Sequence, residues 1–153
     1  MKKLALALLV STALIVPGSA MAANVNVSVN LKNYGAGGTY LAVYVVDSAG
    51  NYKQTLWVAG SRSRYWGHLS GWARGISGTN DRVDGLTGPS LGGGRTLNVS
   101  ANIADSMLDA GYYVVVDSAI ENWGQYPFDA AAPLSNGGTG SGKGFVNSVT
   151  VQY

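Results

Sequence analysis

The sequence predicts an all-β protein: an immunoglobulin-like β-sandwich of about seven strands with one short helix or helical loop. Two observations favour this fold class. Gly, Asn, Ser, Val and Tyr are abundant while Glu and Lys are scarce, a composition that favours strands and turns over helices. Short segments with strand-like patterns also recur along the chain, separated by long connections, as in immunoglobulin-type sandwiches.

The clearest strand signals lie in the first half of the chain. Apolar and polar side chains alternate strictly in residues 24–32, which predicts a half-buried strand. A glycine-rich turn at residues 35–38 precedes residues 40–46, which are strand-like on both faces. Residues 47–51, Asp-Ser-Ala-Gly-Asn, predict a hairpin turn that leads back into a partner strand over residues 52–58.

A helical segment and a long loop are expected next. Aromatic and leucine side chains recur at helical spacing in residues 61–74, where Ser61 or Ser63 is a candidate N-cap. Two glycines weaken this helix, so we expect a short helix or helical loop that crosses the sandwich. Residues 75–94 are dense in Gly, Asp and Thr and predict a long irregular loop. Loops of this length are uncommon without a function.

The second half of the chain predicts further strands. Residues 95–101 alternate as a strand does, a helical turn is expected at residues 103–108, and residues 112–116 are strongly strand-forming. Residues 137–144 predict a flexible loop, and residues 145–153 a final strand that closes the fold.

The N-terminus has the three parts of an export signal. Two lysines precede an apolar run, residues 4–16, and Ala-Met-Ala at residues 20–22 places small residues where signal peptidase requires them. The run is shorter than the roughly 20 residues of a membrane-spanning helix. We therefore predict a cleaved secretory signal peptide, residues 1–22, and a single β-sandwich domain, residues 23–153. The expected location is the periplasm, with secretion beyond it as an alternative.

Charge and cysteine content exclude several classes of function. Of the ten Lys and Arg residues, two belong to the predicted signal, and the remaining eight balance the eight Asp and Glu residues. A neutral mature domain has no electrostatic basis for general binding to nucleic acid or membrane surfaces. Because the chain has no cysteine, disulfides, thiolate metal sites and cysteine nucleophiles are excluded.

The predicted long loop contains a candidate attachment site at residues 84–90, Asp-Gly-Leu-Thr-Gly-Pro-Ser. This stretch resembles the motif of covalently flavinylated extracytoplasmic proteins: Asp, Gly or Ala, any residue, Ser or Thr, Gly, Ala, then Ser or Thr. The matching positions are Asp84, Gly85, Thr87, Gly88 and Ser90. The resemblance implies that an FMN transferase joins the phosphate of FMN to the Ser90 hydroxyl. Pro89 departs from the motif, and a plain Gly/Pro turn explains the stretch equally well.

Several segments of the mature chain carry a second resemblance through their order and spacing. They are residues 40–47 leading into 50–56, an aromatic stretch at 64–74, the loop at 84–90, residues 110–122 and residues 144–151. In this order they resemble a family of uncharacterised periplasmic proteins encoded near PepSY-type membrane reductases and iron-uptake genes. The resemblance implies a small redox accessory that exchanges electrons with a PepSY-like membrane reductase through bound FMN, as a carrier more than as an enzyme with its own substrate.

Aromatic and basic side chains supply candidate contacts for such a cofactor. The tryptophans and tyrosines are candidates to stack on the isoalloxazine ring, the tryptophans being Trp57, Trp66, Trp72 and Trp123. The arginines that are candidates to pair with the phosphate are Arg62, Arg64, Arg74 and Arg95. For most of these aromatic residues a place in the core is the better interpretation, and for the arginines a solvated face.

Other chemistry finds little support in the sequence. His68 is the only histidine and has neither a Gly-x-Ser-x-Gly elbow nor a second metal-ligand histidine to work with. Haem ligation by His68 and Met107 has no attachment motif beside it. The close carboxylate pairs do not match a calcium loop. These pairs are Asp81 with Asp84, Asp105 with Asp109, and Asp117 with Glu121. We therefore predict no catalytic and no metal-binding residues.

Two alternatives to the flavin hypothesis stay open. The first is a cofactor-free binding or scaffolding β-sandwich in the periplasm, favoured by Pro89 and by the Asn-rich first strand, which is a candidate assembly edge. The second is a matrix or adhesin subunit, suggested by the glycine-rich loops and the neutral mature chain.

Overall fold

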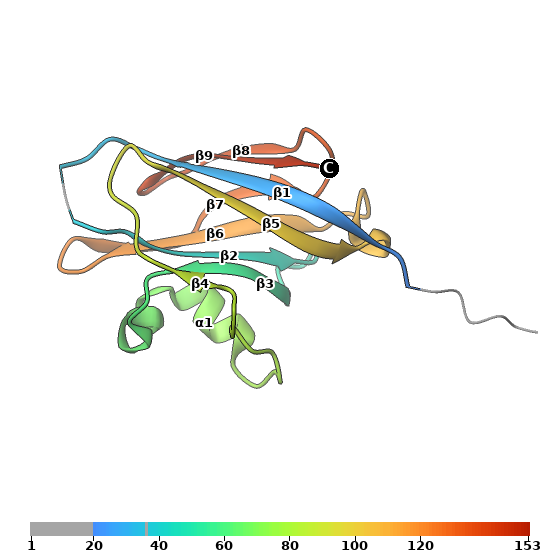
Figure 1. Ribbon diagram of the computed structural model, residues 1–153, viewed down its shortest axis with the longest axis horizontal. Helices are drawn as coiled ribbons and strands as arrows, with labels where there is room; N and C mark the ends of the chain where they lie inside the picture. Colours follow the sequence, from blue (N-terminus) through green and yellow to red (C-terminus); the bar gives the residue numbers. More distant parts are fainter. Residues whose placement is uncertain (1–19, 36) are drawn as a thin grey trace, which may run out of the picture.

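The computed structural model describes residues 20–35 and 37–153, which form two β-sheets packed face to face (Figure 1). The strands are β1 (Ala22–Leu31), β2 (Tyr40–Val46), β3 (Tyr52–Ala59), β4 (Thr87–Gly88), β5 (Thr96–Ala104), β6 (Tyr113–Ile120), β7 (Gly124–Pro133), β8 (Thr139–Ser141) and β9 (Val146–Gln152). The helices are η1 (Ser63–His68), α1 (Ser70–Ile76) and η2 (Asp105–Met107), of which the two η helices are of the 3-10 type. The predicted all-β sandwich is confirmed.

The order of the strands has the core connectivity of an immunoglobulin-like sandwich. One sheet has the order β5-β1-β9-β8 and the other the order β4-β3-β2-β6-β7. β1 pairs with β5 in the first sheet, and β2 pairs with β6 in the second. Strands B, C, E and F of an immunoglobulin domain are related in the same way. β9 lies beside β1, so the last strand of the chain takes the place that strand A has in that fold.

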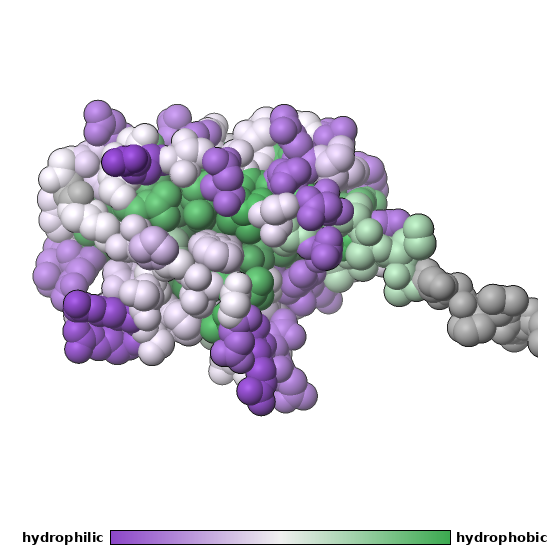
Figure 2. Space-filling model, viewed as in Figure 1, coloured by the Kyte–Doolittle hydropathy of each residue, from purple (hydrophilic) through white to green (hydrophobic). Residues whose placement is uncertain are grey.

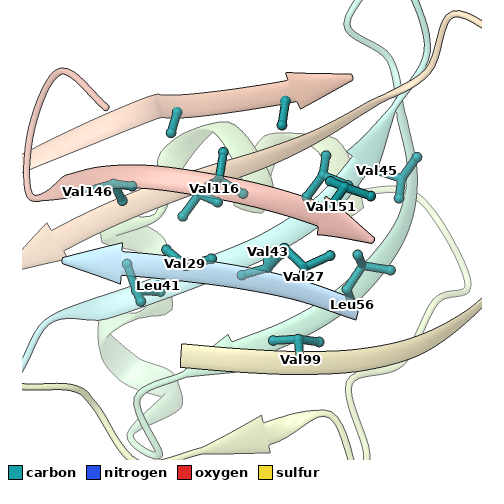
Figure 3. Close-up of a cluster of buried hydrophobic side chains, with 14 of the residues drawn as sticks. Val27, Val29, Leu41, Val43, Val45, Leu56, Val99, Val116, Val146 and Val151 are labelled. Carbon is teal, nitrogen blue, oxygen red and sulfur yellow. The ribbon is translucent and has the colours of Figure 1, made fainter. Parts of the chain in front are cut away.

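The main hydrophobic core lies between the two sheets (Figure 3). Alternate residues of β1 point into it, and Val25, Val27 and Val29 are almost completely buried. Val43 from β2 and Val116 from β6 meet them from the opposite sheet. Full burial of each such side chain contributes about 1.5–3 kcal/mol. The alternation in the sequence therefore specifies which face of β1 points inward.

A second hydrophobic cluster covers the outer face of the five-stranded sheet. Leu69 and Trp72, from the helical segment, are buried against side chains of β2 and β6. The helical segment predicted in residues 61–74 is confirmed as η1 and α1, which lie beneath this sheet in Figure 1. Neither predicted serine caps it, because the N-cap position of η1 is Arg62 and that of α1 is Leu69.

Three predicted segments differ from the structure. The helical turn expected at residues 103–108 is shorter, because β5 continues to Ala104 and the 3-10 turn covers only η2. β6 continues to Ile120 and is followed by β7, which the sequence did not predict. Pro127 lies within β7, and a proline is tolerated there because β7 is an edge strand. The loop expected at residues 137–144 contains β8.

Two buried aspartates, Asp117 on β6 and Asp129 on β7, hold an irregularity in the β6–β7 ladder. The pairing register shifts between Val116 and Ser118, and Phe128 has a φ of 50°. Asp117 accepts hydrogen bonds from the backbone N–H of Phe128 at 2.8 Å, from that of Trp72 at 2.8 Å and from the Tyr44 hydroxyl at 2.9 Å. The bond from Phe128 holds this residue in a positive-φ conformation, which is costly for a non-glycine residue.

Asp129 joins the same irregular segment to the opposite sheet. Its carboxylate accepts hydrogen bonds from the Ser118 hydroxyl at 2.5 Å and from the backbone N–H groups of Gly144 and Val146 at 2.5 and 2.9 Å. Val146 begins β9, so this one side chain connects β6, β7 and β9. Among the described residues, every buried side-chain nitrogen or oxygen atom has a hydrogen-bond partner, as buried polar groups require.

The outer face of the four-stranded sheet is polar and uncharged along β1. Hydrogen bonds join Ser28 to Asn98 and Asn24 to Ser100 across β1 and β5. β1 pairs on both sides, so the prediction that it is an assembly edge is wrong. Figure 2 shows hydrophobic residues in a band between the two layers and hydrophilic residues over the outside.

Most of the predicted signal peptide, residues 1–19, lies outside the described residues. β1 begins at Ala22, which is the last residue of that prediction. Within residues 20–35 and 37–153, no helix combines the length and the apolar character needed to cross a membrane.

Candidate functional site

The segment that carries the predicted attachment motif is more ordered than the expected irregular loop. β4 pairs with β3 in parallel, with Thr87 opposite Val58. The N–H groups of Val58 and Gly60 donate to the carbonyl oxygens of Leu86 and Gly88 at 2.8 and 2.7 Å. The motif therefore runs along the edge of the five-stranded sheet, held by backbone hydrogen bonds.

Local geometry explains both glycines of the motif. Gly85 has a φ of 77°, a conformation that glycine adopts without steric cost, in the turn that follows Asp84. Gly88 lies against the indole of Trp57, since a Cβ at position 88 would come within 2.8 Å of that ring. Asp84 and Thr87 are exposed. The glycines thus fit the fold itself, while the polar side chains remain free of the core.

Ser90, the predicted acceptor, is exposed directly after this ordered stretch. The next residue, Leu91, exchanges two backbone hydrogen bonds with Thr39, at 2.6 and 3.1 Å. The hydroxyl of Ser90 lies against Gly38, and any side chain at position 38 would occupy the space of the hydroxyl. Ser90 is therefore held between β4 and the Thr39–Leu91 bridge, with its hydroxyl in a gap that Gly38 leaves open.

A hollow of about 360 Å³ adjoins this serine, and we call it the Ser90 pocket. It is lined by Gly37, Gly38, Tyr40, Ser90, Ile120, Glu121, Asn122 and Trp123. Its volume is in the range of small-molecule sites, which begins at about 300 Å³. The lining residues come from three separate parts of the chain: the segment before β2, the end of the motif and the β6–β7 turn.

The β6–β7 turn holds the backbone of Trp123 in a fixed conformation beside the Ser90 pocket. The N–H of Trp123 donates to the carbonyl oxygen of Ile120 at 3.0 Å, and Asn122 has a φ of 64°. Asparagine is one of the few residues that tolerate this left-handed conformation in a turn. The side chain of Trp123 is 61 % exposed, the largest exposed fraction among the tryptophans.

The other three tryptophans are buried or half-buried and pack within the fold. Trp72 is buried and donates its indole N–H to the Thr55 hydroxyl at 2.9 Å. Trp66 packs edge-on against Trp72 and donates to the carbonyl oxygen of Gly60 at 2.7 Å. Trp57 is half-buried against the main core. Of the four tryptophans predicted as stacking candidates, Trp123 is the one that lines the Ser90 pocket.

The Ser90 pocket is slightly acidic. Glu121 is its one carboxylate, and its described lining contains no arginine or lysine. The arginines predicted as phosphate partners do not line it: Arg64 lies over the Tyr65 ring, 4.8 Å from its centroid, and Arg74 lines a different hollow. None of the four predicted arginines is among the described residues that line the Ser90 pocket.

Another hollow, of about 500 Å³, lies beside α1 and contains none of the motif residues. Arg74, Tyr52 and Phe128 are among the residues that line it, and the Tyr44–Asp117 hydrogen bond lies close to its lining residue Gly71. Burial and, secondarily, the Asp117 carboxylate raise the pKa of Tyr44. Burial and the Asp81 carboxylate raise the pKa of Tyr52 to about 12.

The remaining candidates from the sequence are separated in space. His68 is exposed on η1 and contacts the Gln125 amide at 2.6 Å. Met107 packs against the core between the sheets, so the two do not form a haem-ligand pair. Asp117 is buried among its hydrogen-bond donors, whereas Glu121 is exposed. In the part of the chain that the structure describes, no three carboxylate or histidine side chains cluster as a metal site would require.

Sequence reasoning missed Glu121 as part of the site, together with the glycines at positions 37 and 38, and it did not single out Tyr40 among the tyrosines. The available signal was the turn sequence Glu-Asn-Trp-Gly at residues 121–124, which separates two strand-forming stretches. Pro127 obscured the second of these strands, so the hairpin that presents Trp123 was not predicted.

A comparison with models of known protein families shows to which family this chain belongs. The model of DUF2271, described as a predicted periplasmic protein, matches residues 22–148. The chain belongs to this family. The match spans strands of both sheets and includes every residue that lines the Ser90 pocket. Membership supports the predicted periplasmic location. No curated protein and no solved structure matches the chain significantly.

Proposed function

We propose that this DUF2271 member is a periplasmic redox accessory that carries FMN covalently on Ser90 and exchanges electrons with a PepSY-like membrane reductase. One observation carries the proposal. Ser90 is exposed and lines a pocket of about 360 Å³, in which Trp123 offers an open aromatic face. A tethered cofactor suits a periplasmic protein, because a dissociated flavin would be diluted and lost.

The side chains of the motif suit attachment by a second enzyme. Asp84, Gly85 and Thr87 are exposed at the edge of the five-stranded sheet, where a transferase can reach them. In the proposed step the Ser90 oxygen displaces AMP from flavin adenine dinucleotide. A new O–P bond forms to the FMN phosphorus, the pyrophosphate O–P bond breaks, and the hydroxyl proton passes to a base of the transferase.

The chain would hold the cofactor and not transform a substrate of its own. Bound FMN would supply reversible uptake of two electrons and two protons, for which the membrane reductase is the redox partner. The role of the chain's residues is then to fix the phosphate position through Ser90 and to provide the pocket. The buried aspartates fix the β6–β7 hairpin, whose turn carries Trp123.

The test is co-expression with an FMN transferase, followed by measurement of the intact mass. We expect a product heavier than the unmodified protein by FMN minus one water, and no such product from Ser90→Ala. Ser77→Ala is the matched control, because Ser77 is also an exposed serine between α1 and β4. An unmodified mass for the wild-type chain, with the transferase active on a known substrate, would overturn the proposal.

A second variant addresses the departure from the motif. Proline fixes its own φ and restricts the residue before it, so Pro89 limits how Gly88 and Ser90 adapt to a transferase. We expect Pro89→Ala to be modified faster than the wild-type chain in the same assay. Modification at equal or lower rate would show that Pro89 is compatible with the transferase.

The second candidate function is the cofactor-free binding or scaffolding β-sandwich, and Pro89 is the observation that favours it. The uncharged polar face over β1 and β5 is available for such a role. The mass measurement decides between the two candidates, because a scaffold needs no adduct on Ser90.

A further inference from the structure

We infer that the Ser90 pocket is a docking site for the isoalloxazine ring, which stacks on the Trp123 indole beside the Glu121 carboxylate. This inference rests on Ser90 as the point of attachment. Trp123 is the side chain that the ring contacts, and Glu121 is the side chain that affects its reduction potential.

The exposure of Trp123 is the first argument. A tryptophan that is 61 % exposed leaves a large apolar face in contact with water. A planar ring stacked on that face removes both surfaces from water and adds the favourable geometry of aromatic pairs. Tyr40, the other aromatic residue of the pocket, already packs edge-on against Tyr65 with a centroid distance of 5.6 Å. Trp123 is therefore the aromatic side chain of the pocket with a free face.

The rigidity of the hairpin is the second argument. Ile120 of β6 pairs with Gly124 of β7, so the turn that carries Trp123 is closed at its base by the strand ladder. Asp117 and Asp129 fix the irregular part of β7 with six hydrogen bonds. A stacking platform held in this way loses little conformational freedom when a ring binds, which favours docking.

Glu121 is the third argument, because it sets the charge of the pocket. A carboxylate beside the ring disfavours the added electron density of the reduced form, and no cation among the described lining residues offsets it. The pocket thus holds the cofactor at a more negative potential than a neutral pocket would. The variant Glu121→Gln removes this charge while keeping the size of the side chain.

The experiment compares the flavin fluorescence of the loaded wild-type chain with that of loaded Trp123→Ala. Stacking on an indole quenches flavin emission, and typical stacking energies favour the stacked form about fivefold. We therefore expect loaded Trp123→Ala to be about fivefold brighter than the wild type. Tyr113→Ala is the matched control, because Tyr113 is also an exposed aromatic residue but lies at the opposite end of β6. Equal brightness of all three loaded proteins would overturn the inference.

A second form of the experiment separates this inference from the proposed function. The chain has no cysteine, so Ser90→Cys supplies a unique thiol to which an iodoacetyl flavin can be coupled without any transferase. We expect the same quenching in this conjugate, relieved by Trp123→Ala. If the transferase fails to load Ser90 while the conjugate shows the quenching, the proposed function fails and the docking site stands. If the conjugate shows no dependence on Trp123, the docking site fails whatever the transferase does.

The reduction potential provides an independent readout. We expect Glu121→Gln to shift the potential of the attached flavin to a more positive value, and Asp105→Asn, which changes an exposed carboxylate outside both the motif and the pocket lining, to leave it unchanged. An unchanged potential in Glu121→Gln would exclude the carboxylate from the neighbourhood of the ring.

Discussion

The middle and the tip of the β6–β7 hairpin differ in how their polar side chains are used. Toward its middle, Asp117 is completely buried and accepts three hydrogen bonds. At its tip, Glu121 and Trp123 are exposed beside Ser90. The first region has every polar atom satisfied within the protein, and the second leaves its polar and aromatic groups available to another molecule.

One hairpin thus contains both polar side chains that stabilise the fold and polar side chains that are available to another molecule. A buried carboxylate surrounded by donors is costly to alter, because each donor would lose its partner in a region without water. Exposed side chains at the tip contribute little to stability. Their arrangement around a pocket is therefore not required for folding, and the proposed attachment of FMN would use it.

The largest effect is expected at Asp117. The variant Asp117→Ala leaves three buried donors without an acceptor and should lower the free energy of unfolding by about 3–5 kcal/mol. Urea unfolding followed by circular dichroism measures this loss. Glu121→Gln is the control and should change stability by less than about 0.5 kcal/mol. Similar losses in both variants would remove the distinction between the two regions.

A smaller loss is expected at Gly71, which approaches Asp117 from α1. A Cβ at position 71 would come within 2.8 Å of the Asp117 carboxylate and 2.9 Å of the Tyr44 hydroxyl. Gly71→Ala should therefore cost about 1–3 kcal/mol, as overpacking of a buried site does. Thermal unfolding measures the change, and Gly67→Ala, where a Cβ meets no atom within 4 Å, is the control.

The pH dependence of stability tests the tyrosine beside α1. The folded-state pKa of Tyr52 is raised to about 12, so its stabilising contribution is complete below the unfolded pKa of about 10 and is lost as the pH rises toward 12. The advantage of the wild type over Tyr52→Phe should therefore shrink above pH 10, by about 1 kcal/mol or less because Tyr52 is partly solvated. Urea unfolding of both proteins at pH 8 and pH 11 measures this change, and a constant difference would contradict it.

The smallest effects are expected in the Ser90 pocket. Ser90→Ala and Trp123→Ala should each change the free energy of unfolding by about 0.5 kcal/mol or less, since both side chains are exposed and neither is buried in a core cluster. Denaturation in urea checks this directly. A loss comparable with that of Asp117→Ala would make these residues structural and would weaken the case for a binding site.

The fold was largely accessible from the sequence, while the assembly of the site was not. The alternation in β1 and the hairpin turn after Asp47 predicted two elements that the structure confirms, the latter with Asp47 accepting from the N–H groups of Ala49 and Asn51 at 3.0 and 2.9 Å. Such signals are local, because they depend on side-chain period and turn chemistry. The strand β7 was not predicted, because Pro127 is unusual within a strand. In addition, the irregularity at Phe128, which has a positive φ, breaks the alternation of inward and outward side chains.

The residue pattern alone was enough to predict the all-β class, which the structure confirms. It also predicts an export-type N-terminus and places Ser90 at the end of an attachment-like motif. The tertiary structure decided what surrounds that serine. Gly38, Ser90 and Trp123 lie far apart along the chain and reach one pocket only because β2, β4 and β6 belong to one sheet. The burial of Asp117 was likewise decided by packing, because no local pattern marks which carboxylate will lie beneath a helix. Contacts between distant segments depend on the order of the strands, and neither composition nor side-chain period encodes that order.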